Sequence, residues 1–247
     1  MQRFDGFYDE GVDRKRLRHG IEAKKISQGV FDDTTLMTLY ELSKKKAFDR
    51  LTGLVSQGKE ANVYHGVGGR GEVAVKIYCV DACDFRRMSE NIASDPRFSV
   101  GKNRRRLVYQ WAQREYKNLR RVSKKVSCPK PFAVANNVLV MGFVGRDGVP
   151  APKLKDASLP DPAGYFAQVV EAIKGMYSCG IVHGDLSEYN ILDDEGPVAI
   201  DFSMGVTLRH FKAETMLARD VENITKFFRK RGVDASQDKV LFSITSK

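Results

Sequence analysis

Residues 183–192, HGDLSEYNIL, decide the fold prediction because they place several polar side chains between two apolar runs. The second run, residues 197–200, ends directly at Asp201, and we expect both runs to be strands. Asp185, Asn190 five residues later and Asp201 eleven residues after that are then presented at strand ends. One carboxylate can orient a hydroxyl group or a water molecule, while an amide and a carboxylate can hold a hard cation. The segment therefore predicts phosphoryl transfer from a Mg-nucleotide. The alternative is a polar loop between two core strands.

The composition is that of a globular protein with an excess of positive charge. The chain has 247 residues, enough for one large domain or for two lobes around a cleft. Its 42% hydrophobic and 29% charged residues exclude a disordered chain. The 41 Lys and Arg residues against 31 Asp and Glu residues give a net charge of +10. Such an excess favours an anionic partner, although a basic solvated face fits the charge equally well.

The start of the chain, MQRFD, has no apolar core of the kind found in signal peptides. No apolar stretch approaches the length of a membrane span. None of the four cysteines forms a CxxC pair, which indicates reduced thiols. We therefore expect a cytoplasmic protein without a membrane partner.

Lys76 lies in an alternating segment, residues 72–78, that predicts a strand. Its Val and Ile side chains share one face, so Lys76 points to the other face. A strand lysine of this kind is either a solubilising residue at a sheet edge or a phosphate ligand. Just before it, residues 51–66 predict a strand, a loop and a second strand.

Glu115 interrupts the apolar face of a helix that we predict from about Asn103 to about Lys125. It lies one turn from Trp111 and one turn from Leu119. An acidic side chain on an apolar face needs a partner, and Lys76 is the candidate. The alternative places Glu115 at the edge of the stripe, paired with a local arginine at the surface.

The remaining periodicity divides the chain into parts. A helix is predicted from Thr34 or Thr35 with Asp33 as its N-cap, and a hairpin over residues 131–144. A Gly- and Pro-rich linker follows, then a helix capped by Asp161 and stopped by Gly180. The last clear helix runs from about Lys212 to Lys230, and the long connection of residues 79–103 is expected to be functional or mobile. The expected division is an N-terminal extension at 1–33, an N-lobe with its preceding helix at 34–144, and a C-lobe at 145–247.

The order of these parts resembles a two-lobed protein-kinase-like fold. Within that group, residues 56–64, SQGKEANVY, and 183–190 resemble the RIO family of atypical serine/threonine kinases. Residues 95–98, DPRF, and 111–115 resemble its first type, in the compact form of archaeal size. The resemblance covers roughly residues 30 to 232. It implies an α+β fold with a small antiparallel N-lobe sheet, one long helix, and a mostly helical C-lobe lacking the peptide-binding subdomains.

The resemblance also implies catalytic roles. Asp185 matches the residue that orients the hydroxyl group or accepts its proton, and Asn190 and Asp201 match the Mg²⁺ ligands, with Mn²⁺ as a possible substitute. Lys76 matches the lysine that holds the α- and β-phosphates of ATP, with Glu115 as its ion-pair partner.

Nucleotide contacts are implied in the same way. Ser56 and Lys59 match the phosphate loop, in which one glycine replaces the usual three. Adenine is expected at the edge formed by the hairpin and the linker. The residues expected to bind the nucleotide are Ser56, Lys59, Val63, Lys76, Met141 as gatekeeper, Gly142 through its carbonyl group and Val144 through its amide group.

One departure concerns the substrate. Asp201 is followed by Phe-Ser, and the chain has no long activation loop and no room for a peptide-binding subdomain before its final helix.

Four functions therefore stay open. They are a kinase that phosphorylates itself in the 79–103 loop and acts in small ribosomal subunit maturation, an ATPase switch through an aspartyl-phosphate on Asp201, a non-catalytic ribosome- or RNA-binding module that uses the basic runs, and a small-molecule phosphotransferase. The expected partners are ATP and the precursor of the small ribosomal subunit or its RNA; the sequence does not identify a protein substrate.

Overall fold

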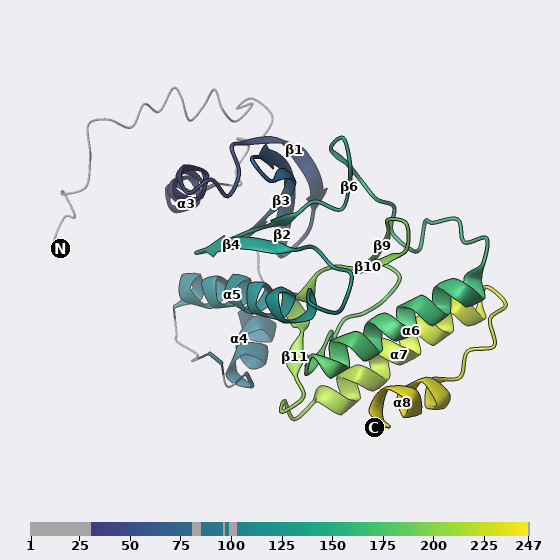
Figure 1. The fold of residues 1–247 in the computed structure, drawn as a ribbon. Helices are drawn as coiled ribbons and strands as arrows, with labels where there is room; N and C mark the ends of the chain where they lie inside the picture. Colours follow the sequence, from purple (N-terminus) through teal and green to yellow (C-terminus); the bar gives the residue numbers. More distant parts are fainter. Residues whose placement is uncertain (1–30, 81–84, 96, 99–102, 247) are drawn as a thin grey trace, which may run out of the picture.

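The computed structural model describes residues 31–80, 85–95, 97–98 and 103–246, without the side chains of residues 86 and 87. The upper part in Figure 1 is a five-stranded antiparallel sheet with the strand order β1-β2-β3-β5-β4. Most of the expected extension, residues 1–33, lies outside the described residues. The strands are β1 (Arg50–Gln57), β2 (Ala61–Gly68), β3 (Gly71–Tyr78), β4 (Pro131–Ala135) and β5 (Val138–Gly142).

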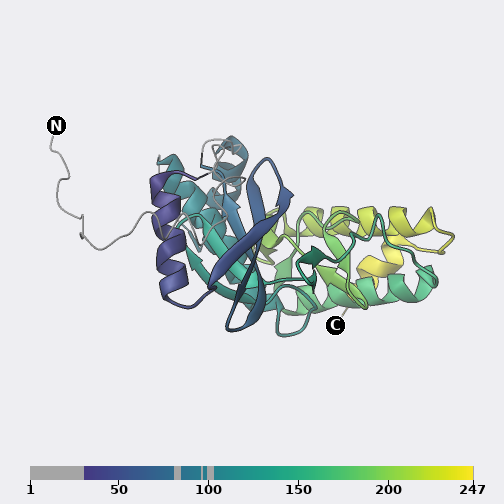
Figure 2. The same cartoon turned by 90° about the horizontal axis from the view of Figure 1, so that it is seen from above.

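The two faces of this sheet pack against different helices. Val73, Val75 and Ile77 are buried in a cluster with residues of α3 (Asp33–Lys44). Ala74 and Tyr78, on the opposite face, belong to the main core together with residues of α5 (Arg104–Val122). Figures 1 and 2 show α3 on the outer side of the sheet and away from the helices of the other lobe. The predicted alternation of β3 is therefore confirmed, and it turns Lys76 toward the inner face.

Two predicted helix boundaries are wrong by a few residues. Helix α3 begins at Asp33, and its cap is Asp32, whose carboxylate accepts the N–H of Thr35 at 2.8 Å. Neighbouring aspartates compete for this role, and the one that reaches the third backbone N–H is the cap. Helix α5 begins at Arg104, one residue after the predicted start at about Asn103, but it ends at Val122 and not near Lys125.

Helix α4 (Phe85–Ala93) lies inside the connection 79–103, where no helix was predicted. Among the described side chains of this helix, Met88 and Ile92 are fully buried, one turn apart, and both belong to the main core. Phe85, partly buried against the same core, Met88 and Ile92 lie at helical spacing, so the sequence did contain a helical signal here that was missed.

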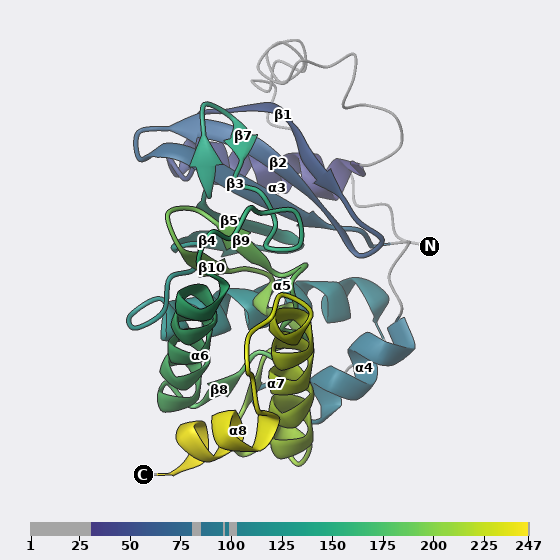
Figure 3. The same ribbon diagram turned by 90° about the vertical axis from the view of Figure 1, so that its right-hand side faces the viewer.

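The lower part is mostly helical (Figure 3). Helix α6 (Pro162–Ser178) has the expected Asp161 cap, and Gly180 follows it with a φ of +72°. Helix α7 (Ala213–Arg229) matches the last predicted helix, but α8 (Gln237–Thr245) was not predicted. This part also contains two short antiparallel pairs: β8 (Ile181–Val182) with β11 (Val206–Thr207), and β9 (Ile191–Asp193) with β10 (Pro197–Ala199).

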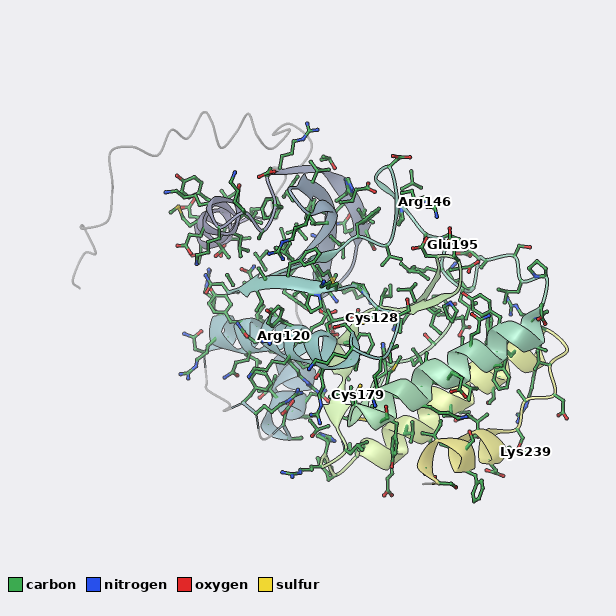
Figure 4. All side chains as sticks on the ribbon, viewed as in Figure 1. Arg120, Cys128, Arg146, Cys179, Glu195 and Lys239 are labelled. Carbon is green, nitrogen blue, oxygen red and sulfur yellow. The ribbon has the colours of Figure 1, made fainter. Side chains whose placement is uncertain are left out.

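The segment between the two parts forms a small hairpin of β6 (Gly145–Arg146) and β7 (Val149–Pro150). Arg146 on this hairpin lies beside Glu195 in the β9–β10 turn, and the two form an ion pair (Figure 4). Their side chains are 75% and 80% exposed, so the pair is expected to add little stability. One main core, with buried residues from the sheet, α5, α6 and α7, joins the two parts.

Three of the four cysteines, Cys79, Cys128 and Cys179, are in the described part, and all three are half-buried. Burial, with a smaller effect from Cys179, raises the pKa of the Cys128 thiol to about 12. In the described residues, no helix is both long and apolar enough to cross a membrane.

Candidate active site

Lys76 is the centre of a buried group of charges between the two parts of the molecule. Its ammonium nitrogen lies 3.0 Å from Glu115 Oε1 and 2.9 Å from Glu115 Oε2. The same nitrogen lies 2.9 Å from Asp201 Oδ1. Glu115 is fully buried, so the structure shows the expected pairing with Lys76 and excludes the alternative of a surface arginine.

These contacts shift the pKa of each group. Burial lowers the pKa of Lys76, but the carboxylates of Asp201 and Glu115 raise it more, so its net pKa lies above the ordinary value. Burial raises the pKa of Asp201, but the charge of Lys76 opposes this and holds the net pKa well below its usual range. For Glu115, burial has the larger effect and raises the pKa despite Lys76. Lys76 and Asp201 are therefore both charged at neutral pH.

Tyr78 also belongs to this group, and the sequence analysis assigned it no role. Its hydroxyl group donates to Glu115 Oε2, and its side chain is almost completely buried. It lies two residues after Lys76, on the same face of β3. The alternation that pointed Lys76 inward applied to Tyr78 as well, so this contact could have been predicted.

The loop after β8 carries Asp185 and Asn190. Asp185 is exposed, and the Asn190 side-chain NH₂ group donates to its carbonyl oxygen at 2.8 Å and to its carboxylate at 3.2 Å. Ile200, between β10 and Asp201, is bonded to the same loop, because its N–H group donates to the Asn190 carbonyl at 2.9 Å. His183 Nε2 lies 2.9 Å from the Ile200 carbonyl oxygen. These bonds link the loop with Asp185 and Asn190 to the backbone directly before Asp201.

Helix α7 holds this loop from below through a buried residue, Asp220, that the sequence analysis missed. Its carboxylate accepts the N–H groups of Gly184 at 2.7 Å and Leu186 at 2.9 Å. Gly184 has a φ of +79°, and a Cβ atom there would lie 2.9 Å from the Met204 carbonyl oxygen. Asn223 adds a bond of 3.1 Å to the Leu186 carbonyl. Asp220 interrupts an apolar stripe as Glu115 does, and that signal could have found it.

The oxygen donors fit a Mg²⁺ ion. The bonds from Lys76 and from Ser203 N–H both end on Asp201 Oδ1, which leaves Oδ2 for a cation. The Asn190 NH₂ group is directed at Asp185, which leaves its amide oxygen for the same purpose. Mg²⁺ is usually held by one or two carboxylates together with water and phosphate oxygens. Asp201 has a φ of +60°, which is uncommon outside glycine and typical of functional sites.

The strand register places the first part of the expected phosphate loop beside Lys76. Ser56 pairs with Val63, and Val63 pairs with Lys76, across β1, β2 and β3. The loop closes through a 3.0 Å bond from Gly58 N–H to the Ala61 carbonyl. Ser56 and Lys59 are exposed, and neither bonds to Lys76 in the described part of the chain.

The expected adenine edge lies at the end of β5. Met141 is mostly buried opposite Ala74, on the inner face of the sheet. The Gly142 N–H group is used in a 2.8 Å bond to the Lys130 carbonyl oxygen, so its carbonyl is the group that can face a ligand. The Val144 carbonyl accepts Ala151 N–H at 3.1 Å, while its own N–H donates to none of the described residues. Val144 N–H is therefore available for an adenine nitrogen.

The path from Asp201 to helix α7 is short. It consists of a 3₁₀ turn (Phe202–Met204), strand β11 and the turn before Ala213. Residues 202–212 therefore contain no helix that could support an extended peptide. As the sequence indicated, the site has the parts for phosphoryl transfer without a built platform for a peptide substrate.

Comparisons with known proteins give relatives for most of the chain. Residues 62–241 match the family model of the RIO domain. A Methanocaldococcus jannaschii protein described as a RIO-type serine/threonine-protein kinase Rio1 is 45% identical over 94% of this chain and 81% of its own length. A Caenorhabditis elegans serine/threonine-protein kinase RIO1 is 36% identical; the match covers 96% of this chain but only 48% of that protein.

Among solved structures, a Rio2 kinase from Chaetomium thermophilum, in an ADP/Mg²⁺-phosphoaspartate complex, matches with a TM-score of 0.66. The match has 23% identity and covers 86% of this chain and 66% of that chain. At this identity the match shows the fold. It confirms the predicted two-lobed, kinase-like α+β architecture.

Proposed function

The chain belongs to the RIO family of atypical serine/threonine kinases, and we propose from this that it is an ATP- and Mg²⁺-dependent serine/threonine kinase that also phosphorylates itself. The observation that carries the proposal is the contact of one lysine, Lys76, with both Glu115 and Asp201. This contact joins the expected phosphate-holding residue to the expected metal ligand. The loop with Asp185 and Asn190 supplies the remaining groups.

Each residue has a defined part in the proposed reaction. Lys76 holds the α- and β-phosphates, and Glu115 keeps its ammonium group directed into the cleft. Asp185 orients the attacking hydroxyl group and accepts its proton. Asn190 and Asp201 hold the metal ion, which, when bound, neutralises charge on the phosphate oxygens.

The nucleotide itself is placed by the N-lobe. Ser56 and Lys59 cover the phosphates, Val63 and Met141 line the base site, and the Gly142 carbonyl and Val144 amide bind the adenine edge. The buried inner face that Met141 shares with Ala74 supports this placement.

Replacement of Asp185 by Ala tests the proposal. We expect transfer of labelled γ-phosphate to fall by at least about a hundredfold, because a positioned general base contributes roughly that much or more. Asp194→Ala, at an exposed carboxylate in the β9–β10 turn, is the matched control and should keep normal transfer. Undiminished transfer by Asp185→Ala overturns the proposed chemistry.

A second candidate is an ATPase switch that passes through an aspartyl-phosphate on Asp201. It is favoured by the short path between Asp201 and α7, which supplies no peptide platform, and by the phosphoaspartate named for the Chaetomium thermophilum Rio2 kinase. In this reaction the Asp201 carboxylate attacks the γ-phosphorus, ADP leaves, and water then hydrolyses the acyl phosphate. Phosphate that is released by hydroxylamine supports the switch, whereas phosphate found only on Ser or Thr excludes it.

The proposed setting is maturation of the small ribosomal subunit in the cytoplasm, with the precursor particle or its RNA as partner. The net charge of +10 and the exposed Lys44, Lys45 and Lys46 support an RNA contact. In a second basic run, residues 104–106 at the start of α5, Arg105 is already paired with Asp32 at 2.6 Å. A purely RNA-binding module would show no turnover with Mg-ATP, and a small-molecule phosphotransferase would act on aminoglycosides or choline.

A further inference from the structure

Helix α5 does more than carry Glu115: it also holds the backbone of the loop that presents Asp201. Asn118, one turn after Glu115, donates from its side-chain nitrogen to the Phe202 carbonyl at 3.0 Å and to the Gly205 carbonyl at 2.8 Å. Both carbonyls belong to the turn immediately after Asp201. The side chain of Asn118 is completely buried.

Arg114 reinforces this contact from the preceding turn of the same helix. Its Nε atom donates to the Gly205 carbonyl at 3.1 Å, and its Nη2 atom donates to the Met204 carbonyl at 3.3 Å. Together, Arg114 and Asn118 bind three carbonyl groups of the turn. Asp201, with its φ of +60°, needs such an outside restraint, because a non-glycine residue keeps this conformation only where its surroundings enforce it.

The side-chain oxygen of Asn118 also has a hydrogen-bond partner. Its oxygen accepts a 2.8 Å hydrogen bond from Arg97 Nη1. Asp95 orients Arg97 with two bonds, 2.9 Å from Nε to Oδ1 and 2.7 Å from Nη2 to Oδ2. This chain fixes which end of the amide faces the turn. The NH₂ group of Asn118 therefore stays directed at the two carbonyls.

We propose that Asn118 is a positioning residue for the metal site: it sets the conformation of residues 201–205 so that the Asp201 carboxylate is aimed at the bound Mg²⁺. It touches neither substrate nor metal, and it acts through the backbone of the turn. The inference rests on the proposed use of Asp201 as a metal ligand. Residues that orient a metal ligand in this way typically change metal affinity by about 10- to 100-fold when they are replaced.

Asn137 provides a matched control. It is also buried, and its side-chain nitrogen also donates two hydrogen bonds, to Thr35 Oγ1 at 3.0 Å and to the Tyr78 carbonyl at 2.9 Å. These contacts join the N-lobe sheet to α3 and do not involve the turn after Asp201. Asn137→Ala should thus reproduce the loss of stability of Asn118→Ala without its effect on the metal.

The main measurement is calorimetric titration of ADP at several Mg²⁺ concentrations, together with melting temperatures. Mg²⁺ is expected to increase the affinity for ADP, and the Mg²⁺ concentration that gives half of this increase measures the Mg²⁺ requirement. For Asn118→Ala we expect this concentration to rise by about tenfold or more. The affinity for ADP without Mg²⁺ should stay within about twofold. For Asn137→Ala both quantities should remain at the wild-type value. An unchanged Mg²⁺ requirement in Asn118→Ala overturns the proposal, as does an equal rise in Asn137→Ala.

Gly205 offers a second variant should Asn118→Ala fold poorly. A Cβ atom on Gly205 would lie 2.7 Å from the Asn118 side-chain nitrogen, while its φ of −59° is one that alanine adopts readily. Gly205→Ala should therefore raise the Mg²⁺ requirement by pushing Asn118 away from the turn. In the Asn118→Ala background, where that atom is missing, Gly205→Ala should add little; full additivity of the two effects contradicts the positioning role.

The experiments distinguish a failure of the proposed kinase or ATPase function from a failure of the proposed role of Asn118. A wild-type protein that binds ADP in a Mg²⁺-dependent way but neither transfers nor hydrolyses phosphate contradicts the kinase and ATPase proposals and leaves the calorimetric test of Asn118 intact. A wild-type ADP affinity that does not respond to Mg²⁺ overturns the positioning role directly.

Discussion

Glu115 was found from the sequence because a carboxylate interrupts the apolar face of a helix. The structure places it in contact with Lys76 and Tyr78, fully buried. The rule works because a charged side chain without a partner costs several kcal/mol in an apolar surrounding, so a natural sequence keeps one there only with a partner. Asp220, Arg114 and Asn118 are buried on helix faces for the same reason.

Asp95 gives a prediction that depends on pH. Burial raises its pKa, but the hydrogen bonds and charge of Arg97, with that of Arg114, lower it more, so the net pKa lies below the ordinary 3.8. A carboxyl group with a lowered pKa in the folded state stabilises the fold above about pH 4, and this contribution is lost as the pH falls through the folded-state pKa. Asp95→Asn should therefore lower the free energy of unfolding by about 3 kcal/mol at pH 7 and by less at acidic pH.

Urea denaturation at pH 7 and at about pH 3 measures this effect. Asp156→Asn is the control, because that side chain is 57% exposed and its pairing with Lys155 is at the surface. A difference between Asp95→Asn and the wild type that is the same at both pH values would argue against this role of the carboxylate charge.

At the scale of elements, two helices position the site from opposite sides. Helix α5 presents Arg114, Glu115 and Asn118 to Lys76 and to the turn after Asp201. Helix α7 presents Asp220 to the loop before Asp185. Their turns are spaced so that residues three or four apart lie on one face, which lets a single helix hold several backbone groups at once.

Asp220→Asn tests the role of α7. An amide has one acceptor oxygen and one NH₂ group, so one of the two backbone N–H groups, of Gly184 or Leu186, would lose its partner. We expect a loss of about 2 kcal/mol in the free energy of unfolding, together with a reduced rate of phosphate transfer. Glu222→Gln, exposed on the same helix, should change neither. If Asp220→Asn has the stability and the rate of phosphate transfer of the wild type, α7 does not support the loop through Asp220.

Helix α3 is expected to support the sheet without taking part in the reaction. Leu39, 3% exposed, is buried against the outer face of the sheet. Leu39→Ala should cost about 3 kcal/mol of stability, because it leaves a cavity there. Met37→Ala on the same helix, at a side chain that is 47% exposed, should cost little. The KM for ATP should be unchanged in both, and a large rise in KM for Leu39→Ala would show that α3 influences the site.

At the scale of the whole molecule, the net charge of +10 predicts salt-dependent binding to small-subunit ribosomal RNA. Each phosphate contact contributes about 0.7 to 0.9 to the slope of log affinity against log salt concentration. Replacing Lys44, Lys45 and Lys46 by alanine should therefore reduce that slope by about two if these exposed side chains contact RNA. A filter-binding titration at several salt concentrations measures the slope; no dependence on salt in the wild type would contradict an RNA partner.

Much of the local structure could be predicted from the sequence. The alternation of β3, the hairpin of β4 and β5, and the Asp161 cap of α6 were all predictable, because neighbouring residues along the chain decide them. Helices α4 and α8 were missed although each has apolar residues at helical spacing, because both are short, with nine residues each.

The contacts between distant segments were only partly predictable. Lys76 could be named as the candidate partner of Glu115, with a surface arginine left as the alternative, and motif spacing placed Asp185, Asn190 and Asp201 at strand ends. No spacing indicated that Asn118 would bind carbonyl groups 84 and 87 residues further along the chain. Backbone carbonyls are the same in every residue, so a contact with one leaves no mark on the sequence at the accepting position.

By itself, then, the sequence determined which residues are chemically able to hold a nucleotide, a metal ion and a hydroxyl group, because side-chain identity and local periodicity are written along the chain. Only the tertiary structure decided that one helix, α5, contacts both Lys76 and the turn after Asp201, and that α7 holds the loop with Asp185 through Asp220. Those contacts arise where packing brings buried polar groups together, and each group must then find a partner inside the protein.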